Sequence, residues 1–186
     1  MKLILPKTFI EKSVIQSPLF FLQGPVQGGE NWQERCCLEI TRHLDNFFVV
    51  VPCRWGESSR FFSYSIEGRL DVFQRQTAWE HHYLNLACEL GKNRKGCIIV
   101  WLPVESKKFP RSDGQPYARD TYGEIGRWGR NCALSGSNFV VGAEPDFPGL
   151  SQIKENLRLD FNGIVDFPVS VTLEETVKRA VSLIQT

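Results

Sequence analysis

Apolar and polar positions along the chain form two kinds of block that alternate. Short, unbroken apolar runs, which are typical of buried strands, occur at residues 17–24, 46–53, 96–103 and 138–143. Apolar residues recur every three or four positions, which predicts helices, at residues 31–45, 72–90, 121–135, 151–159 and 172–184. A fifth strand is expected at residues 163–167. The chain is therefore predicted to alternate strand and helix along most of its length.

Strands that alternate with helices favour right-handed crossovers and a parallel sheet between helical layers. The run GCIIVWLP at 96–103 is the strongest strand signal, and we expect it in the centre of the sheet with Ile98, Val100 and Leu102 buried against helices. Five strands and about five helices predict an α/β fold. Its core would be a doubly wound parallel five-stranded sheet in a flavodoxin-like or Rossmann-like three-layer sandwich. No repeat or linker divides the chain, so residues 1–186 are predicted to be a single domain.

Composition narrows the class of protein. Hydrophobic residues make up 42% of the 186 residues, which suits one sizeable core. The net charge of +1 argues against a protein that coats DNA or RNA, so no nucleic acid polymer is expected as a partner. No apolar run is long enough for a membrane span, and residues 1–12 are too interrupted for a signal peptide. We therefore expect a soluble cytoplasmic protein.

The cysteines and histidines do not have the spacing of a metal site. The six cysteines form no CxxC pair, and the chain contains only three histidines. We expect reduced structural cysteines, and neither a metal ion nor a cofactor. His81 and His82 are adjacent on a predicted helix, where neighbouring side chains point about 100° apart. One is expected to be packed and the other solvated.

Ligands of doubly wound sheets bind beyond the carboxyl ends of the strands. This directs attention to the segments 24–32, 54–71 and 104–120 and to the helix start at Thr121. The first segment, GPVQGGENW, contains Gly24, Gln27, Gly28 and Gly29. Its glycines allow backbone amides to approach a ligand closely, or they simply form a tight strand-to-helix turn. Its spacing matches neither the dinucleotide fingerprint nor the Walker loop.

Two glutamates are candidate catalytic residues. Glu124 lies three residues after Thr121, so it either closes a capping box or is a carboxylate kept ionised by the helix start and available for nucleophilic attack on a sugar carbon. Glu80 follows Trp79, and is either a solvated helix residue or a second acid of the same site. We expect the two to converge on one pocket, where their like charges would raise the pKa of one of them.

The long polar segment 104–120 is predicted to be a mobile lid over the site. It carries Lys107, Lys108, Arg111 and Arg119. We expect these basic side chains to hold a 5′-phosphate if the substrate has one.

Several motifs together resemble the nucleoside 2-deoxyribosyltransferase-like family. They span residues 20–142 and are, in order, FFLQGPVQGG, QTAWEHHYLNLA, CIIVWLP and TYGEIGRW. The resemblance implies that Glu124 is the nucleophile and Glu80 the assisting carboxylate, a role usually filled by Asp in the family. It also implies that the glycine loop at Gly24, Gly28 and Gly29 contributes to binding, and that subunits of a homo-oligomer complete one another's sites.

The function implied is cleavage or transfer at the N-glycosidic bond of a 2-deoxyribonucleoside or deoxynucleotide through a covalent glycosyl-glutamate intermediate. An aromatic face suits any nucleobase, so Trp79, Trp101 or Tyr122 could stack on the base. Two alternatives remain: a non-catalytic module that binds a nucleotide in the same cleft, and a protein–protein scaffold that retains only the fold.

Overall fold

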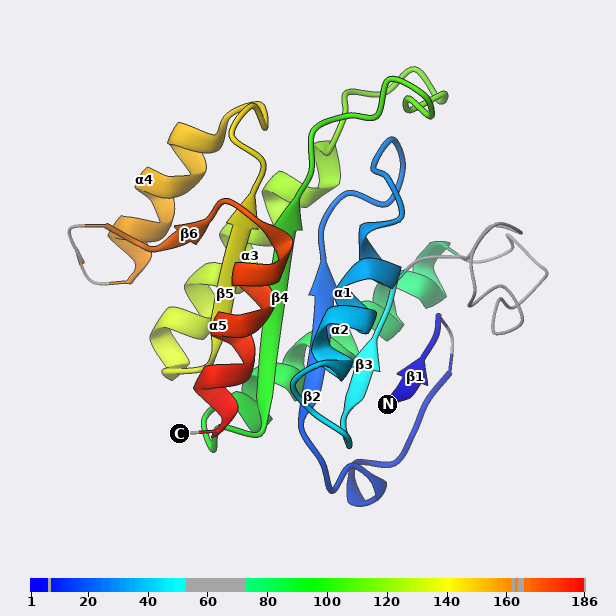
Figure 1. Ribbon diagram of the computed structural model, residues 1–186, viewed down its shortest axis with the longest axis vertical. Helices are drawn as coiled ribbons and strands as arrows, with labels where there is room; N and C mark the ends of the chain where they lie inside the picture. Colours follow the sequence, from blue (N-terminus) through cyan, green and yellow to red (C-terminus); the bar gives the residue numbers. More distant parts are fainter. Residues whose placement is uncertain (7, 53–72, 162, 164–165, 186) are drawn as a thin grey trace.

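The computed structural model describes residues 1–6, 8–52, 73–161, 163 and 166–185 (Figure 1). The predicted loop at 54–71 lies outside the described residues, as do Cys53 and the expected first residue of the helix at 72. The strands are β1 (Lys2–Ile4), β2 (Leu19–Gln23), β3 (Phe48–Val50), β4 (Gly96–Leu102), β5 (Phe139–Ala143) and β6 (Val169–Ser170). The helices are α1 (Trp32–Thr41), α2 (Phe73–Gly91), α3 (Arg119–Ser135), α4 (Leu150–Asp160) and α5 (Leu173–Gln185), with a short 3-10 turn at Lys12–Val14.

Within the described residues, six strands form one sheet in the order β1-β3-β2-β4-β5-β6, and every pair is parallel. Without β1 this is the flavodoxin-like order, which confirms the predicted doubly wound α/β fold. The expected strand count of five is corrected to six. The missed strand, β1, has only three residues, too few for a recognisable period, and pairs with β3 at the edge of the sheet.

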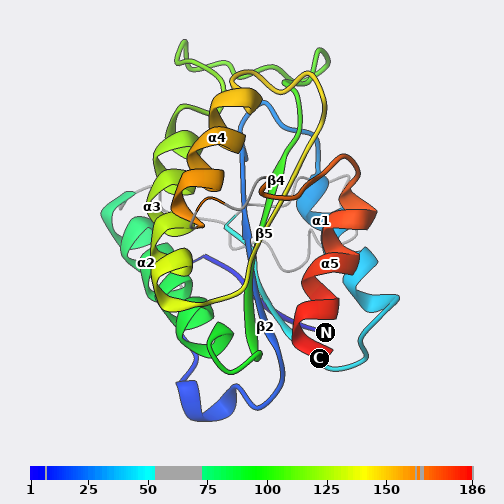
Figure 2. The ribbon, with the colours of Figure 1, turned by 90° about the vertical axis from the view of Figure 1, so that its left-hand side faces the viewer.

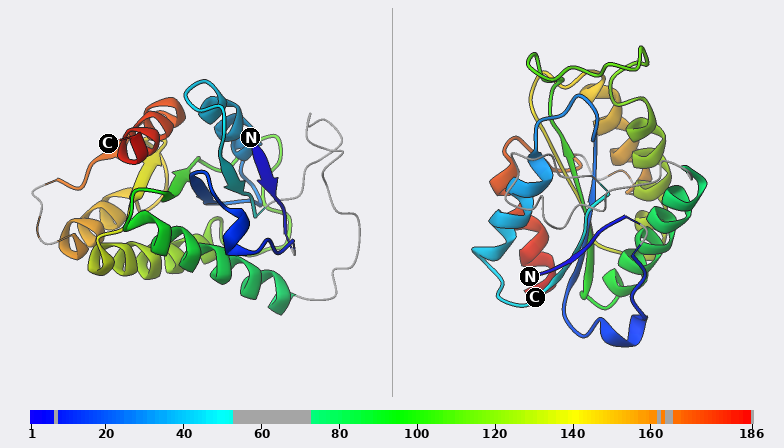
Figure 3. Two further views of the ribbon diagram at one scale, coloured as in Figure 1. Left: turned by 90° about the horizontal axis from the view of Figure 1, so that it is seen from below. Right: turned by 90° about the vertical axis from the view of Figure 1, so that its right-hand side faces the viewer.

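Helices cover both faces of the sheet. Figure 2 shows α1 and α5 on one side and α2, α3 and α4 on the other, and the view from below in Figure 3 shows the same three layers. The buried apolar residues accordingly form two clusters, one on each face. Alternate residues of β4 enter different clusters: Ile98, Val100 and Leu102 face α2 and α3, whereas Trp101 faces α1 and α5.

The prediction for β4 is confirmed. The strand lies between β2 and β5, parallel to both, and Ile98, Val100 and Leu102 are fully buried. Its length and unbroken apolar character match a strand covered by helices on both faces.

Several element boundaries differ from the predicted ones. The strand expected at 163–167 is replaced by β6, which begins only after that range, at Val169; residues 164–165 lie outside the described part. The start of α5 is as predicted, because the Thr172 hydroxyl accepts a hydrogen bond from the amide of Glu175 (3.1 Å). Gly136, with φ of +66°, ends α3 as expected. Among the described residues, no helix has the length and apolar character needed to span a membrane.

Candidate active site

The direction in which the chain winds reverses between β2 and β4. From β2 the chain passes through α1 to β3 on one side, and from β4 it passes through α3 to β5 on the other. In doubly wound sheets this reversal opens a crevice at the carboxyl ends of the two central strands, where ligands bind. Gln23 is the last residue of β2 and pairs in register with Val100 of β4. It therefore lies at the reversal point.

Glu124 comes to this region on the second turn of α3. The helix begins at Arg119, preceded by Ala118 in a left-handed conformation with no side-chain cap. Thr121 is therefore not the N-cap, and the alternative in which Glu124 closes a capping box is excluded. The acidic residue of the first turn is Asp120. Glu124 is also beyond the turn in which the helix end stabilises a negative charge most strongly.

Glu80 and Glu124 are mostly buried carboxyl groups that repel one another. Burial raises the pKa of Glu124 to about 7, with further upward contributions from the negative charges of Glu80 and then Asp120. Burial also raises the pKa of Glu80, opposed by a hydrogen bond from the Gln76 amide (3.0 Å). The sequence predicts that like charges raise one of the two pKa values. Both are raised, and the pKa of Glu124 reaches about 7.

Gln23 is a third polar side chain at this position, and the sequence pattern does not identify it as a site residue. Its side chain is 1% exposed, and neither its amide nitrogen nor its carbonyl oxygen has a hydrogen-bond partner in the described part of the chain. Strand alternation directs it to the face of Phe21, which belongs to the cluster under α2 and α3. Gln23 lies near enough to lower the pKa of Glu124, although the two side chains do not meet with hydrogen-bond geometry.

The glycine loop packs closely against the chain itself. A Cβ on Gly24 (φ +153°) would lie 2.2 Å from the carbonyl oxygen of Trp101. Gly28 (φ +77°) lies against Tyr117, and its carbonyl oxygen accepts a hydrogen bond from the amide of Ser106 (2.7 Å). Both positions therefore need glycine for internal packing.

The other two residues proposed for this loop show no contact that points to a ligand. Gly29 lies against the carbonyl of Pro25, and Gln27 is exposed. A role of this loop in ligand binding stays a prediction.

The aromatic residues proposed to stack on a base do not gather at the two carboxyl groups. Trp79 is fully buried, and its indole N–H donates to the carbonyl of Thr8 (2.7 Å). Trp101 lies on the opposite face of the sheet from α2 and α3. These two expectations are corrected, because neither ring face is open on the side of Glu80 and Glu124. Tyr122 is 36% exposed in the first turn of α3, and its hydroxyl donates to the carbonyl of Pro148 (2.8 Å).

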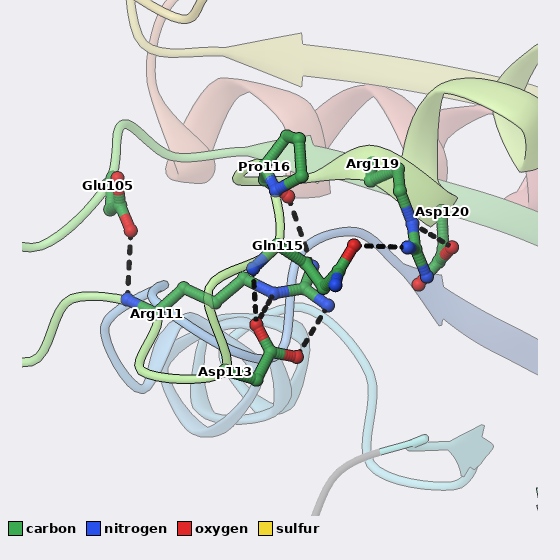
Figure 4. Close-up of polar contacts among 7 residues, drawn as sticks. All are labelled: Glu105, Arg111, Asp113, Gln115, Pro116, Arg119 and Asp120. Atoms are coloured by element: carbon green, nitrogen blue, oxygen red, sulfur yellow. Dashed lines mark hydrogen bonds and ion pairs between the residues drawn. The ribbon is translucent and has the colours of Figure 1, made fainter.

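The segment between β4 and α3 extends beyond the carboxyl end of β4 (Figure 1). Figure 4 shows that Arg111 is bound within it: the guanidinium makes a bidentate ion pair with Asp113 (2.6 and 2.8 Å) and donates to the carbonyl of Pro116 (3.2 Å). Arg119 likewise pairs with Asp120 (3.1 Å). Arg111 and Arg119 are thus already paired, whereas Lys107 and Lys108 are exposed.

The two adjacent histidines behave as expected for a packed and a solvated residue. His81 is half-buried with its ring edge-on to Trp128, and His82 is exposed. Across the described ranges, no group of histidine, cysteine, aspartate and glutamate residues could hold a metal ion.

Comparison with known proteins adds no family assignment. The chain matches no protein-family model, and no curated protein matches it. The resemblance to the nucleoside 2-deoxyribosyltransferase-like family therefore stays a prediction based on the four motifs.

Proposed function

We propose that the protein cleaves or transfers at the N-glycosidic bond of a 2-deoxyribonucleoside or deoxynucleotide, with Glu124 as nucleophile and Glu80 as acid–base. One observation supports this most: two largely buried carboxyl groups on different helices both have raised pKa values, and the charge of Glu80 adds to the rise at Glu124. Pairs of titratable groups with such environments are typical of catalytic sites. Cleavage of a glycosidic bond by a retaining mechanism uses two carboxyl groups, one as acid–base and one as nucleophile.

A retaining reaction needs one proton on this pair of carboxyl groups. Near neutral pH that proton lies mainly on Glu124, whose pKa is about 7, because burial and the charge of Glu80 both favour its protonated form. The reaction needs Glu124 ionised and Glu80 protonated, so the proton must move from Glu124 to Glu80 before attack. A Glu124 oxygen then forms an ester bond with the anomeric carbon while the carbon–nitrogen bond breaks, and the Glu80 proton passes to the departing base.

The second step restores the site. A nitrogen of an incoming base, or the oxygen of water, attacks the anomeric carbon, and the ester bond to Glu124 breaks with its electron pair returning to the carboxylate. The proton of the attacking group passes to Glu80. Side chains alone perform both steps, so the proposal includes no metal ion and no cofactor. We also propose that the enzyme acts as a homo-oligomer in the cytoplasm, where its five described cysteines, all buried, would stay reduced.

A non-catalytic nucleotide-binding module is the second candidate, and the two carboxyl groups disfavour it. A nucleotide is an anion, and a site built only to hold it gains nothing from two buried carboxyl groups, whose desolvation is costly. A module of this kind would keep its ligand affinity when Glu124 loses its charge. A catalytic site would lose its activity when Glu124 loses its charge.

The test is incubation of the protein with deoxynucleosides, their 5′-monophosphates and free bases, followed by chromatographic separation of products. We expect Glu124→Gln to lower turnover by at least about 10³-fold and Glu80→Gln by about 10²-fold. Glu155→Gln is the matched control, because Glu155 is an exposed glutamate on α4 paired with Arg158. Equal turnover of the parent protein and Glu124→Gln would refute the mechanism.

A further inference from the structure

Gln23 carries a hydrogen-bonding capacity that the described part of the folded chain does not use. Its carboxamide is buried at the end of β2, on the side of the sheet that holds Glu80 and Glu124. A buried amide without partners destabilises the protein. Such a group is expected where a ligand, and not the protein, supplies the partner.

Glu124 cannot satisfy the whole carboxamide. An ionised carboxylate only accepts hydrogen bonds, so at best it takes the amide N–H of Gln23 and leaves the carbonyl oxygen unpaired. A protonated Glu124 could donate to that oxygen, and the N–H would then be unpaired. In either state one polar atom of Gln23 needs a further group. A hydroxyl meets the requirement in both cases, because it donates and accepts.

The geometry of nucleophilic attack identifies which hydroxyl this is. In a β-nucleoside the base is on one face of the sugar, and a nucleophile that displaces it approaches from the other face. The 3′-hydroxyl points to that second face, whereas carbon 2 of a 2-deoxy sugar carries only hydrogens. A side chain beside the nucleophile therefore meets the 3′-hydroxyl first.

We propose that Gln23 binds the 3′-hydroxyl of the substrate sugar and thereby holds the anomeric carbon in line with Glu124. This inference rests on the proposed function, and it adds a specificity-determining residue and a requirement on the sugar. The substrate class becomes nucleosides or nucleotides with a free 3′-hydroxyl. Sugars without it would leave the carboxamide of Gln23 unpaired. The site would therefore discriminate against them more strongly than it would through the loss of an apolar contact.

The experiment compares sugars that differ only in this group, with a purine and a pyrimidine base. The pairs are 2′-deoxyadenosine with 2′,3′-dideoxyadenosine, and thymidine with 3′-deoxythymidine. For the parent protein we expect kcat/KM to fall at least about tenfold when the 3′-hydroxyl is removed. In Gln23→Met, which keeps the size of the side chain and removes both polar atoms, the two sugars should differ by less than about threefold.

Gln33→Met is the matched control. Gln33 is also buried, on α1 at the other face of the sheet, and its amide nitrogen also has no partner among the described residues. This variant should keep the full preference for the 3′-hydroxyl. If Gln23→Met lowers kcat/KM of both sugars by the same factor, or if the parent protein does not distinguish them, the inference is refuted and Gln23 acts only on Glu124.

Calorimetric binding to Glu124→Gln separates this inference from the proposed chemistry. One outcome is that no nucleoside is turned over, but Glu124→Gln binds 2′-deoxyadenosine at least tenfold more tightly than 2′,3′-dideoxyadenosine. If Gln23→Met removes that difference in affinity, the proposed chemistry fails and the inference about Gln23 holds. If neither compound binds at millimolar concentration, the inference is refuted. Circular dichroism of each variant verifies that it is folded.

Discussion

The thiols of Cys88 and Cys132 lie 3.1 Å apart where α2 packs against α3. These are the helices that carry Glu80 and Glu124. The contact is closer than an ordinary packing distance between sulfur atoms and further than the roughly 2.05 Å of a disulfide bond. The two helices thus meet at a buried point where a covalent link needs a movement of only about 1 Å.

We predict that a mild thiol oxidant such as diamide slowly joins Cys88 to Cys132, with loss of two hydrogens from the protein. The reaction should be slow because both residues are buried. The link closes a long loop and should raise the free energy of unfolding by at most about 4 kcal/mol. Peptide mapping under non-reducing conditions detects it. Cys132→Ala should abolish the product and Cys97→Ala should not.

The raised pKa of Glu124 predicts how stability changes with pH. The folded protein binds the proton up to a pH of about 7, whereas the unfolded chain releases it near 4.5. The stabilisation from the protonated form is therefore complete below pH 4.5 and is lost as the pH rises to about 7. Glu124→Gln should gain stability over the parent protein across this window, by at most about 3 kcal/mol.

Denaturant unfolding of both proteins at several pH values tests this. The surface variant Glu155→Gln should show no such gain, because the pKa of Glu155 is lowered by Arg158 and its stabilisation has the opposite pH dependence. A gain for Glu124→Gln that does not change between pH 4.5 and 7 would contradict the raised pKa.

The unpartnered carboxamide of Gln23 predicts a stabilising substitution in the ligand-free protein. Gln23→Met fills the same volume without unpaired polar atoms, so the free energy of unfolding should rise by about 1 kcal/mol. Thermal unfolding measures the difference. Gln27→Met, at an exposed position in the following loop, should change stability by less than about 0.5 kcal/mol. A marked loss of stability in Gln23→Met would mean that the carboxamide is satisfied in the folded protein.

Trp79 should contribute to stability and not to base stacking. Trp79→Phe removes the N–H that donates to Thr8 and should lower the free energy of unfolding by about 1 kcal/mol or more. KM for any substrate should remain within about twofold, because the ring is fully buried. Urea unfolding and steady-state kinetics on the same preparation give both quantities. A large rise in KM with unchanged stability would restore the stacking role.

The segment between β4 and α3 predicts a salt-dependent preference for phosphate. Arg111 is already paired with Asp113, whereas Lys107 and Lys108 are exposed and make no ion pair with a described carboxylate; the Lys108 ammonium lies over the Phe109 ring. Deoxyadenosine monophosphate should bind Glu124→Gln more tightly than deoxyadenosine, and the gap should shrink with added salt. Replacing both lysines with alanine should reduce this difference in affinity further. Equal affinities at low salt would leave this segment as a cover only.

The fold was largely predictable because β4, the strand with the strongest sequence signal, is also the central strand of the sheet. The apolar run of β4 predicted a strand buried on both faces, and the alternating blocks predicted the winding. The same alternation already separates Trp101 from Val100 and Leu102, so its position away from the two carboxyl groups was contained in the sequence. The three residues of β1 were not recognisable, because their pairing with β3 is a tertiary contact.

The site was predictable only in part. Glu80 and Glu124 follow from helix periodicity and motif resemblance, but the start of α3 does not. Ala118 adopts a left-handed conformation without a side-chain cap, so the stronger local signal at Thr121 gave a start two residues too late. Gln23 was missed because a polar residue that ends an apolar strand usually begins a turn. Its burial is a tertiary effect that no local pattern shows.

The short strands at both edges of the sheet have a consequence for self-association. In the part of the chain that the structure describes, one edge is the three-residue β1 and the other is the two-residue β6. A long, flat edge is a template on which another chain can add a strand and aggregate, and very short edge strands provide little of it. The proposed homo-oligomer would therefore form through helices and not through sheet edges, and a concentrated solution should resist the growth of cross-β fibrils.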